Sequence, residues 1–152
     1  MEQSMRDGAM KRLDTFEGEW KLELIHPHYQ SIYGQTSFAW MDGGQFMIQR
    51  TNVDRPEFPS SMLVYDYDLN DGTYLQHYFG SRGVARLYNM SLEDGIWKMW
   101  RNSSDFSSLD FSQRFFGEIK ESGNTIHSTW EKSYDGVNWE HDFSIIYRNI
   151  HR

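Results

Sequence analysis

A histidine and an arginine lie in a stretch that otherwise alternates like a pair of strands, LQHYFGSRGVARLY, from Leu75 to Tyr88. The segment Gly80 to Gly83 is a turn signal, and a four-residue turn there places His77 opposite Arg86 on the apolar face. An imidazole can transfer protons near neutral pH, and a guanidinium can hold a carboxylate or phosphate through two hydrogen bonds. The spacing therefore predicts an inward polar pair suited to an anionic ligand or to acid–base chemistry.

The next hairpin predicts a second inward arginine. A two-residue turn at Asp94-Gly95 aligns Leu92 with Trp97, and the same register places Tyr88 opposite Arg101. Both hairpins share the strand that carries Tyr88, and they agree on its inner face.

Two further segments complete the predicted inner face. A four-residue turn over residues 121–124 aligns Phe115 with Trp130 and turns Gln113 inward. In the last strand His141, Phe143, Ile145 and Tyr147 share one face, and Asp142, Ser144 and Arg148 share the other.

The predicted ligand-binding residues combine aromatic walls with a few convergent polar groups, as small-molecule sites do. They are Trp40, His77, Arg86, Tyr88, Trp97, Arg101, Gln113, Trp130, His141, Phe143 and Tyr147. A buried arginine without a partner costs several kcal/mol, so Arg86 and Arg101 require a counter-charge, water or an anionic ligand. Asp66 is one candidate counter-charge, although the register of its strand, like that of Arg50, stays open. A structural hydrogen bond is the alternative role for His77.

Composition narrows the class of protein. The 152 residues carry a formal charge of -7 and 16% aromatic residues, with no cysteine. Acidic balance without a basic cluster argues against nucleic acid as a partner, and the lack of thiols excludes disulfides and thiolate metal sites. We find no metal-binding motif, no secretory signal and no membrane-spanning apolar run, so a cytoplasmic protein is the expectation.

Period-two alternation dominates after a short helical lead. About ten segments rich in aromatic or β-branched residues are separated by short turns that contain Gly, Asn or Asp. Strands in sequence order, with no helices to cover them, avoid open edges when the sheet closes. We therefore predict an all-β fold in one domain, 1–152: a lead over 1–17 with a short helix, then an antiparallel up-and-down barrel of about ten strands over 18–148.

The stretch LDTFEGEWKLEL combines a short helical lead with Gly18-Glu19-Trp20. It resembles the first strand of the calycins, the lipocalin and fatty-acid-binding superfamily, whose motif there is Gly-x-Trp. That resemblance implies that Trp20 plugs the barrel floor beneath a basic residue, matched here to Arg148. HYFGSRGVARLY, DFSQRF and DGVNWEHDF are similar to a group of uncharacterised bacterial calycin-like proteins. The link between Ile25 and Ile32 is too short for the helical lid of fatty-acid-binding proteins.

Three functions remain open. The first, a barrel that binds a small, largely apolar molecule with an acidic head, needs no cofactor. The second is a haem-binding barrel resembling nitrobindin, with His141 or His77 as the axial ligand. The third is an isomerase-like or hydrolase-like enzyme with His77 as base and Arg86 as oxyanion clamp. Exposed aromatic residues are also compatible with a homodimer.

Overall fold

The computed structural model describes residues 2–28, 30–103 and 110–150. The predicted helical lead consists of helix α1 (Glu2–Lys11) and the 3-10 helix η1 (Arg12–Phe16). A second 3-10 turn, η2 (Glu121–Gly123), joins two later strands. The ten strands are β1 (Gly18–Ile25), β2 (Ile32–Trp40), β3 (Met47–Val53), β4 (Ser61–Asp68), β5 (Thr73–Gly80), β6 (Ala85–Glu93), β7 (Ile96–Arg101), β8 (Ser112–Lys120), β9 (Thr125–Ser133) and β10 (Glu140–Asn149).

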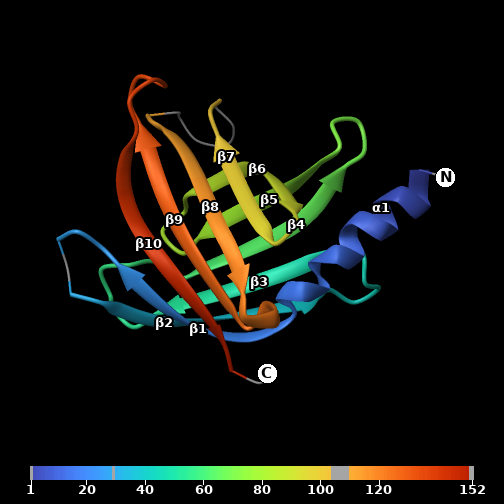
Figure 1. The fold of residues 1–152 in the computed structure, drawn as a ribbon, viewed down its shortest axis with the longest axis horizontal. Helices are drawn as coiled ribbons and strands as arrows, with labels where there is room; N and C mark the ends of the chain where they lie inside the picture. Colours follow the sequence, from blue (N-terminus) through green and yellow to red (C-terminus); the bar gives the residue numbers. More distant parts are fainter. Residues whose placement is uncertain (1, 29, 104–109, 151–152) are drawn as a thin grey trace.

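The strands form a closed antiparallel barrel, as the sequence predicted (Figure 1). Each strand pairs with the next along the chain, and β1 pairs with β10 to close the cylinder. Closure leaves no strand edge unpaired and gives every side chain one of two directions, inward or outward.

Short turns fix much of the register. Asp94 and Gly95 both have positive φ, 54° and 76°, which is the backbone of the two-residue turn that the sequence predicted. Leu92 therefore pairs with Trp97, as expected. The predicted pairing of Phe115 with Trp130 is also confirmed.

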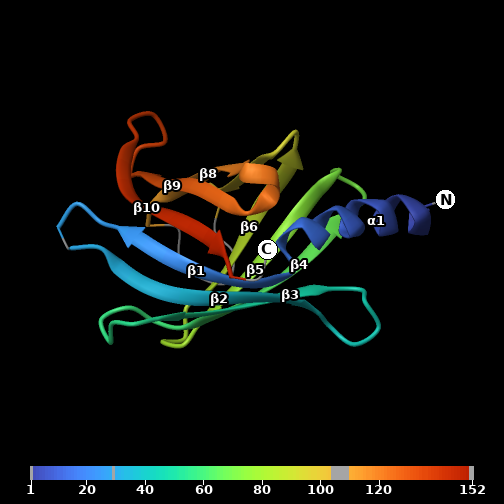
Figure 2. The same cartoon turned by 60° about the horizontal axis from the view of Figure 1, so that its bottom comes forward.

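The helical lead covers one end of the barrel. The lead lies at the end opposite the β9–β10 hairpin, and α1 extends from there away from the barrel (Figures 1 and 2). The residues of the lead that are buried against the strands are Ala9, Met10, Leu13 and Phe16. Tyr74 joins the two parts, because its hydroxyl donates to the Ala9 carbonyl at 2.6 Å. The lead is therefore the floor of the barrel.

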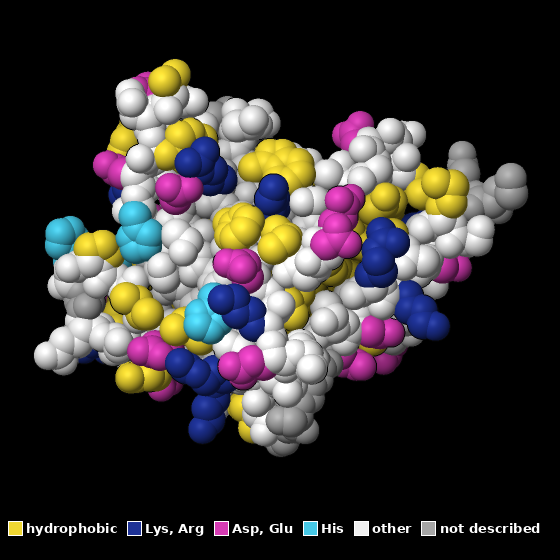
Figure 3. Space-filling view, viewed as in Figure 1, with side chains coloured by type: hydrophobic (Ala, Val, Ile, Leu, Met, Phe, Trp, Pro, Cys, Tyr) yellow, Lys and Arg dark blue, Asp and Glu magenta, His cyan; other side chains and the backbone are white. Residues whose placement is uncertain are grey.

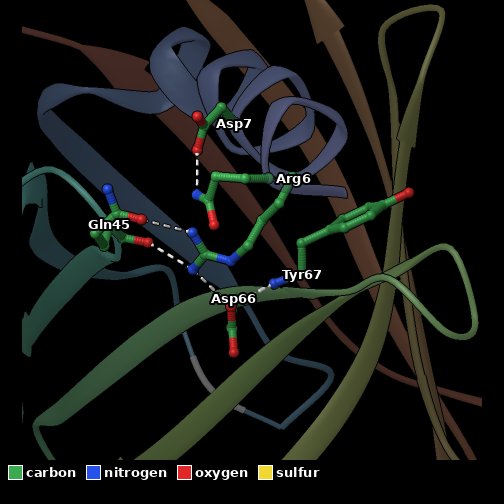
Figure 4. Close-up of polar contacts among 6 residues, drawn as sticks. Arg6, Asp7, Gln45, Asp66 and Tyr67 are labelled. Atoms are coloured by element: carbon green, nitrogen blue, oxygen red, sulfur yellow. Dashed lines mark hydrogen bonds and ion pairs between the residues drawn. The ribbon is translucent and has the colours of Figure 1, made fainter. Parts of the chain in front are cut away.

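A polar clamp holds the outer side of α1 (Figure 4). The Arg6 guanidinium donates to the Asp66 carboxylate on β4 at 2.9 Å, and to the side chain and the backbone carbonyl of Gln45. Asp66 thus pairs with the lead and is not a counter-charge for the inner arginines. Arg50, whose direction the sequence left open, is exposed on the outer face.

Aromatic rings fill the floor. Trp20 is fully buried, its indole N–H donates to the Phe16 carbonyl at 2.8 Å, and its ring meets Tyr147 edge to face. The prediction that Trp20 fills the floor is thus confirmed, but the prediction that Arg148 is its basic neighbour is wrong. Arg148 lies opposite Lys21 on the outer face, where it pairs with Glu23.

One face of the molecule mixes charges of both signs. On the face in Figure 3, Lys and Arg side chains are interspersed with Asp and Glu. Within the described ranges, no helix has the length and apolar character needed to cross a membrane.

Replacement of the floor tryptophan tests how much the barrel depends on it. Trp20→Ala removes a fully buried indole and its hydrogen bond, and we expect the free energy of unfolding to fall by about 3–5 kcal/mol. Urea denaturation followed by circular dichroism measures the loss. Tyr33→Ala, on the exposed face of β2, is the control and is expected to change stability by about 0.5 kcal/mol or less. Equal losses of stability in the two variants would contradict the assignment of Trp20 to the barrel floor.

Buried phenols predict alkaline instability. Burial raises the pKa of Tyr65 and of Tyr147 above the ordinary value near 10, so the fold favours the neutral phenols. Their contribution to stability is complete below pH of about 10, the unfolded-state value, and is lost as the pH rises toward the folded-state values. Urea unfolding across this range should therefore show falling stability. Tyr147→Phe should make the decline shallower; an unchanged slope would show that Tyr147 does not contribute.

Candidate functional site

The barrel encloses a cavity of about 310 Å³, at the small end of ligand-binding sites. Most of its lining is apolar: Leu22, Leu24, Val53, Phe58, Pro59, Leu63, Met99, Phe111, Trp130, Phe143 and Ile145. Phe58 and Pro59 belong to the β3–β4 loop, and Phe111 precedes β8. These connections lie at the barrel end opposite α1, so we call this end the mouth.

The β5–β6 hairpin is one residue out of step with the prediction. Gly80 donates its backbone N–H to the Val84 carbonyl at 2.8 Å, so the loop contains three residues, not four. Gly83 adopts φ +89°, the left-handed position that such loops require. The odd loop length exchanges the two faces of β5 relative to β6. His77 pairs with Leu87 and lies on the outer face, so its predicted inward position is wrong.

The exchange brings other polar groups inside. Gln76 pairs with Tyr88, and Tyr78 pairs with Arg86, and all four side chains line the cavity. Phe79, which shares a face of β5 with His77, is 42% exposed. Sequence reasoning passed over Gln76 and Tyr78 because it treated Gly80 as part of the turn.

Arg86, Tyr88 and Gln113 form a cluster that we call the donor cluster. The Tyr88 hydroxyl donates to Gln113 Oε1 at 2.8 Å, and Arg86 Nη1 donates to the same oxygen at 3.3 Å. Because a guanidinium can only donate, the amide oxygen of Gln113 must face Arg86. Burial raises the pKa of the Tyr88 phenol, although the Arg86 hydrogen bond opposes the shift, so this phenol stays a neutral donor.

A second group of polar side chains crosses β2 to β5. Gln76 Nε2 donates to the Tyr65 hydroxyl at 2.8 Å, and that hydroxyl donates to Gln49 Oε1 at 2.5 Å. Gln49 Nε2 then donates to Thr36 Oγ1 at 2.9 Å. We call this chain the glutamine relay. All four side chains are buried, so the relay satisfies groups that would otherwise be costly inside the barrel.

A bulge in β10 changes the predicted face at the mouth. The pairing with β9 shifts between His141 and Phe143, so that Phe143 faces Trp130 and continues the inner face. His141 is exposed and bonds Ser144 at 3.0 Å, which contradicts its predicted inward position. Asp142, expected outside, lines the cavity and lies 3.9 Å from the Lys132 ammonium.

Three other predicted residues do not line the cavity. Trp40 lies beside the lead, where its indole N–H donates to Asp14 at 2.7 Å. Trp97 is buried in the floor between the rings of Phe16 and Phe115. Arg101 is buried, with 3% of its surface exposed, but is not part of the lining.

The structure thus brings six predicted site residues together on the cavity. They are Arg86, Tyr88, Gln113, Trp130, Phe143 and Tyr147. It adds polar residues that sequence reasoning missed: Gln49, Thr51, Ser61, Gln76, Tyr78 and Asp142. The signal that identifies Gln76 is its alternation with Tyr74 and Tyr78, once the loop length is known.

The lining does not favour an imidazole-ligated cofactor. No histidine is among the described residues that line the cavity, so the lining offers no axial imidazole for haem. Within the described part of the chain, no cluster of three or more His, Asp or Glu side chains is arranged to hold a metal ion.

Comparison with known proteins shows the fold alone. No family model matches this chain, and no curated protein matches it. Among solved structures, Rv2717c from M. tuberculosis is similar, with a TM-score of 0.62 and 11% identity over 93% of this chain and 96% of that one. A protein of unknown function from the DUF3598 family of Nostoc punctiforme also aligns, at 6% identity over 93% and 98% of the two chains, but its TM-score is only 0.29.

Proposed function

We propose that this protein binds a small amphipathic molecule inside the barrel and holds its anionic group with Arg86. The observation that carries the proposal is a guanidinium on the wall of a mainly apolar cavity. Among the described residues, no carboxylate lies within 4.0 Å of the Arg86 side chain. The calycin resemblance supports the same class of activity, because those barrels enclose small ligands.

The surroundings of Arg86 favour an anion. Its guanidinium lies 5.7 Å from the centre of the Phe111 ring near the mouth, and Gln113 Oε1 takes one of its N–H groups. A guanidinium has five N–H donors, so others remain for a ligand. Charge-assisted hydrogen bonds are stronger in a partly dehydrated site than in water, which makes a carboxylate the preferred partner.

The rest of the wall favours a hydrophobic body. Leu22, Leu24 and Ile145 line the side formed by β1 and β10, and Trp130 stacks with Phe143 nearer the mouth. Asp142 lies on this side too, with the Lys132 ammonium 3.9 Å away. An acidic head at Arg86 and an apolar body along β1 and β10 match this division of the cavity.

The alternatives have less support. The enzyme hypothesis used His77 as its base, and that side chain lies on the outer face. The haem hypothesis used His141 or His77, and neither lines the cavity. Both remain predictions, but no arrangement among the described residues favours them.

Substitution of Arg86 tests the proposal. We expect wild-type protein to bind decanoate and cinnamate in isothermal titration calorimetry. Arg86→Met, which keeps the length of the side chain and removes its charge, should weaken binding about 10-fold or more, because a hydrogen bond to a charged group contributes about 1.5–3 kcal/mol.

Two controls accompany this substitution. His77→Gln, on the outer face of β5, should bind like wild type, and cinnamyl alcohol should be insensitive to Arg86→Met. Thermal melts monitor folding of each variant. The proposal would be overturned if neither acid bound to the wild-type protein, or if wild type and Arg86→Met bound the acids with equal affinity.

A further inference from the structure

We infer that Gln76 is a second recognition point, so that the ligand of this cavity carries a hydroxyl or N–H donor in addition to its anionic group. The inference rests on the proposed function and narrows the ligand to hydroxylated or N–H-bearing amphipathic acids. It follows from the direction of the hydrogen bonds in the glutamine relay.

The far end of the relay fixes that direction. Thr36 Oγ1 can donate to the Arg50 backbone carbonyl at 3.1 Å, and a carbonyl can only accept. Thr36 Oγ1 also lies 2.7 Å from Thr51 Oγ1, a contact in which either hydroxyl can be the donor. The Thr36 proton therefore goes to the Arg50 carbonyl or to Thr51. In both arrangements Thr36 Oγ1 accepts from Gln49 Nε2, which also lies 3.4 Å from Thr51 Oγ1, so the nitrogen side of the Gln49 amide faces these two hydroxyls.

The constraint passes along the chain to Gln76. With its nitrogen directed to Thr36, Gln49 presents Oε1 to Tyr65, and the phenol donates to it. The phenol oxygen then accepts from Gln76 Nε2. Burial raises the pKa of Tyr65, so this phenol keeps its proton. The relay thus orients the Gln76 amide with its nitrogen toward Tyr65 and leaves its carbonyl oxygen as the unused end.

The Gln76 oxygen is open to the cavity. Gln76 is 2% exposed and lines the cavity, and no described residue donates to its Oε1. Among the described residues, the enclosed side-chain polar atoms without a partner are Trp97 Nε1 and Asn124 Oδ1. Since Gln76 Oε1 is not among them, this oxygen is not fully enclosed, and within the described part of the chain it has no donor. Such an acceptor favours a ligand that brings one.

The donor cluster has the opposite polarity. Gln113 Oε1 is occupied by Tyr88 and Arg86, which leaves the Gln113 Nε2 group and the remaining Arg86 N–H groups to face a ligand as donors. Gln76 pairs directly with Tyr88 across the β5–β6 ladder, so the two points of recognition are neighbours on one wall. The wall therefore offers donors toward the mouth and an acceptor beside them on β5.

Matched acids test the inference by calorimetry. Para-coumarate differs from cinnamate by one hydroxyl, and para-methoxycinnamate keeps the oxygen but lacks the donor. An aliphatic pair, decanoate and its ω-hydroxy acid, covers a flexible body. For wild type we expect the hydroxyl of at least one pair to improve affinity about 3- to 10-fold, the range for one neutral hydrogen bond, and the methoxy compound to lose that gain.

Gln76→Leu should abolish the gain, so that each hydroxylated acid and its plain counterpart bind this variant with affinities within about 2-fold of one another. The Tyr65-to-Gln49 bond does not involve Gln76, and His77→Gln is the matched outer-face control. The comparison between ligands on one variant cancels any general loss of stability.

The outcomes separate the two proposals. Arg86-dependent binding of the acids without any gain from a hydroxyl, or a gain that persists in Gln76→Leu, would overturn the role of Gln76 and leave the anion site standing. Failure of every acid to bind would overturn both.

Discussion

A closed sheet gives each side chain only two places to go, and this constraint governs everything inside the molecule. Alternation along a strand is strict, so one residue more or less in a hairpin loop exchanges the inner and outer faces of the strand that follows. In the β5–β6 hairpin the loop has three residues, and that number alone decides that Gln76, not His77, lies in the cavity. The bulge between His141 and Phe143 likewise exchanges the inner and outer faces of β10 near the mouth of the barrel.

Polar groups inside an apolar barrel are costly unless each finds a partner, and the cavity satisfies them along one wall. The relay from Gln76 through Tyr65 and Gln49 ends at Thr36, whose hydroxyl contacts the Arg50 carbonyl and the Thr51 hydroxyl. Within the residues that the structure describes, Gln76 Oε1 is left without a donor. The proposed recognition of a ligand uses such an atom, because it gains most from a new hydrogen bond.

The two ends of the cylinder have different tasks. At one end the lead packs Leu13 and Phe16 into the barrel, and Arg6 holds α1 to β4 from outside. At the other end longer connections supply Phe58 and Phe111 to the cavity wall. Aromatic rings seal the floor. The loops that line the cavity lie at the opposite end, the mouth.

Local sequence was sufficient for the architecture, because alternation and turn residues are short-range signals. It predicted about ten strands in sequence order and the turn at Asp94-Gly95, and the structure has both. The buried position of Trp20 in the floor was implied by the resemblance to the calycins. Local sequence was not sufficient to predict which side chains line the cavity. Gly80 reads as a turn residue in the sequence, yet in the barrel it pairs with Val84 as part of the ladder.

Long-range packing also decided which partners the charges take. Asp66 was a candidate counter-charge for the inner arginines, but α1 brings Arg6 to it from 60 residues away. His141 and Asp142 exchanged faces because pairing with β9 introduces a bulge that no local pattern marks. The sequence by itself determined that there would be a barrel with polar groups inside it. Loop lengths, the bulge and the docking of the lead, which are set by the closed sheet as a whole, decided which groups those are.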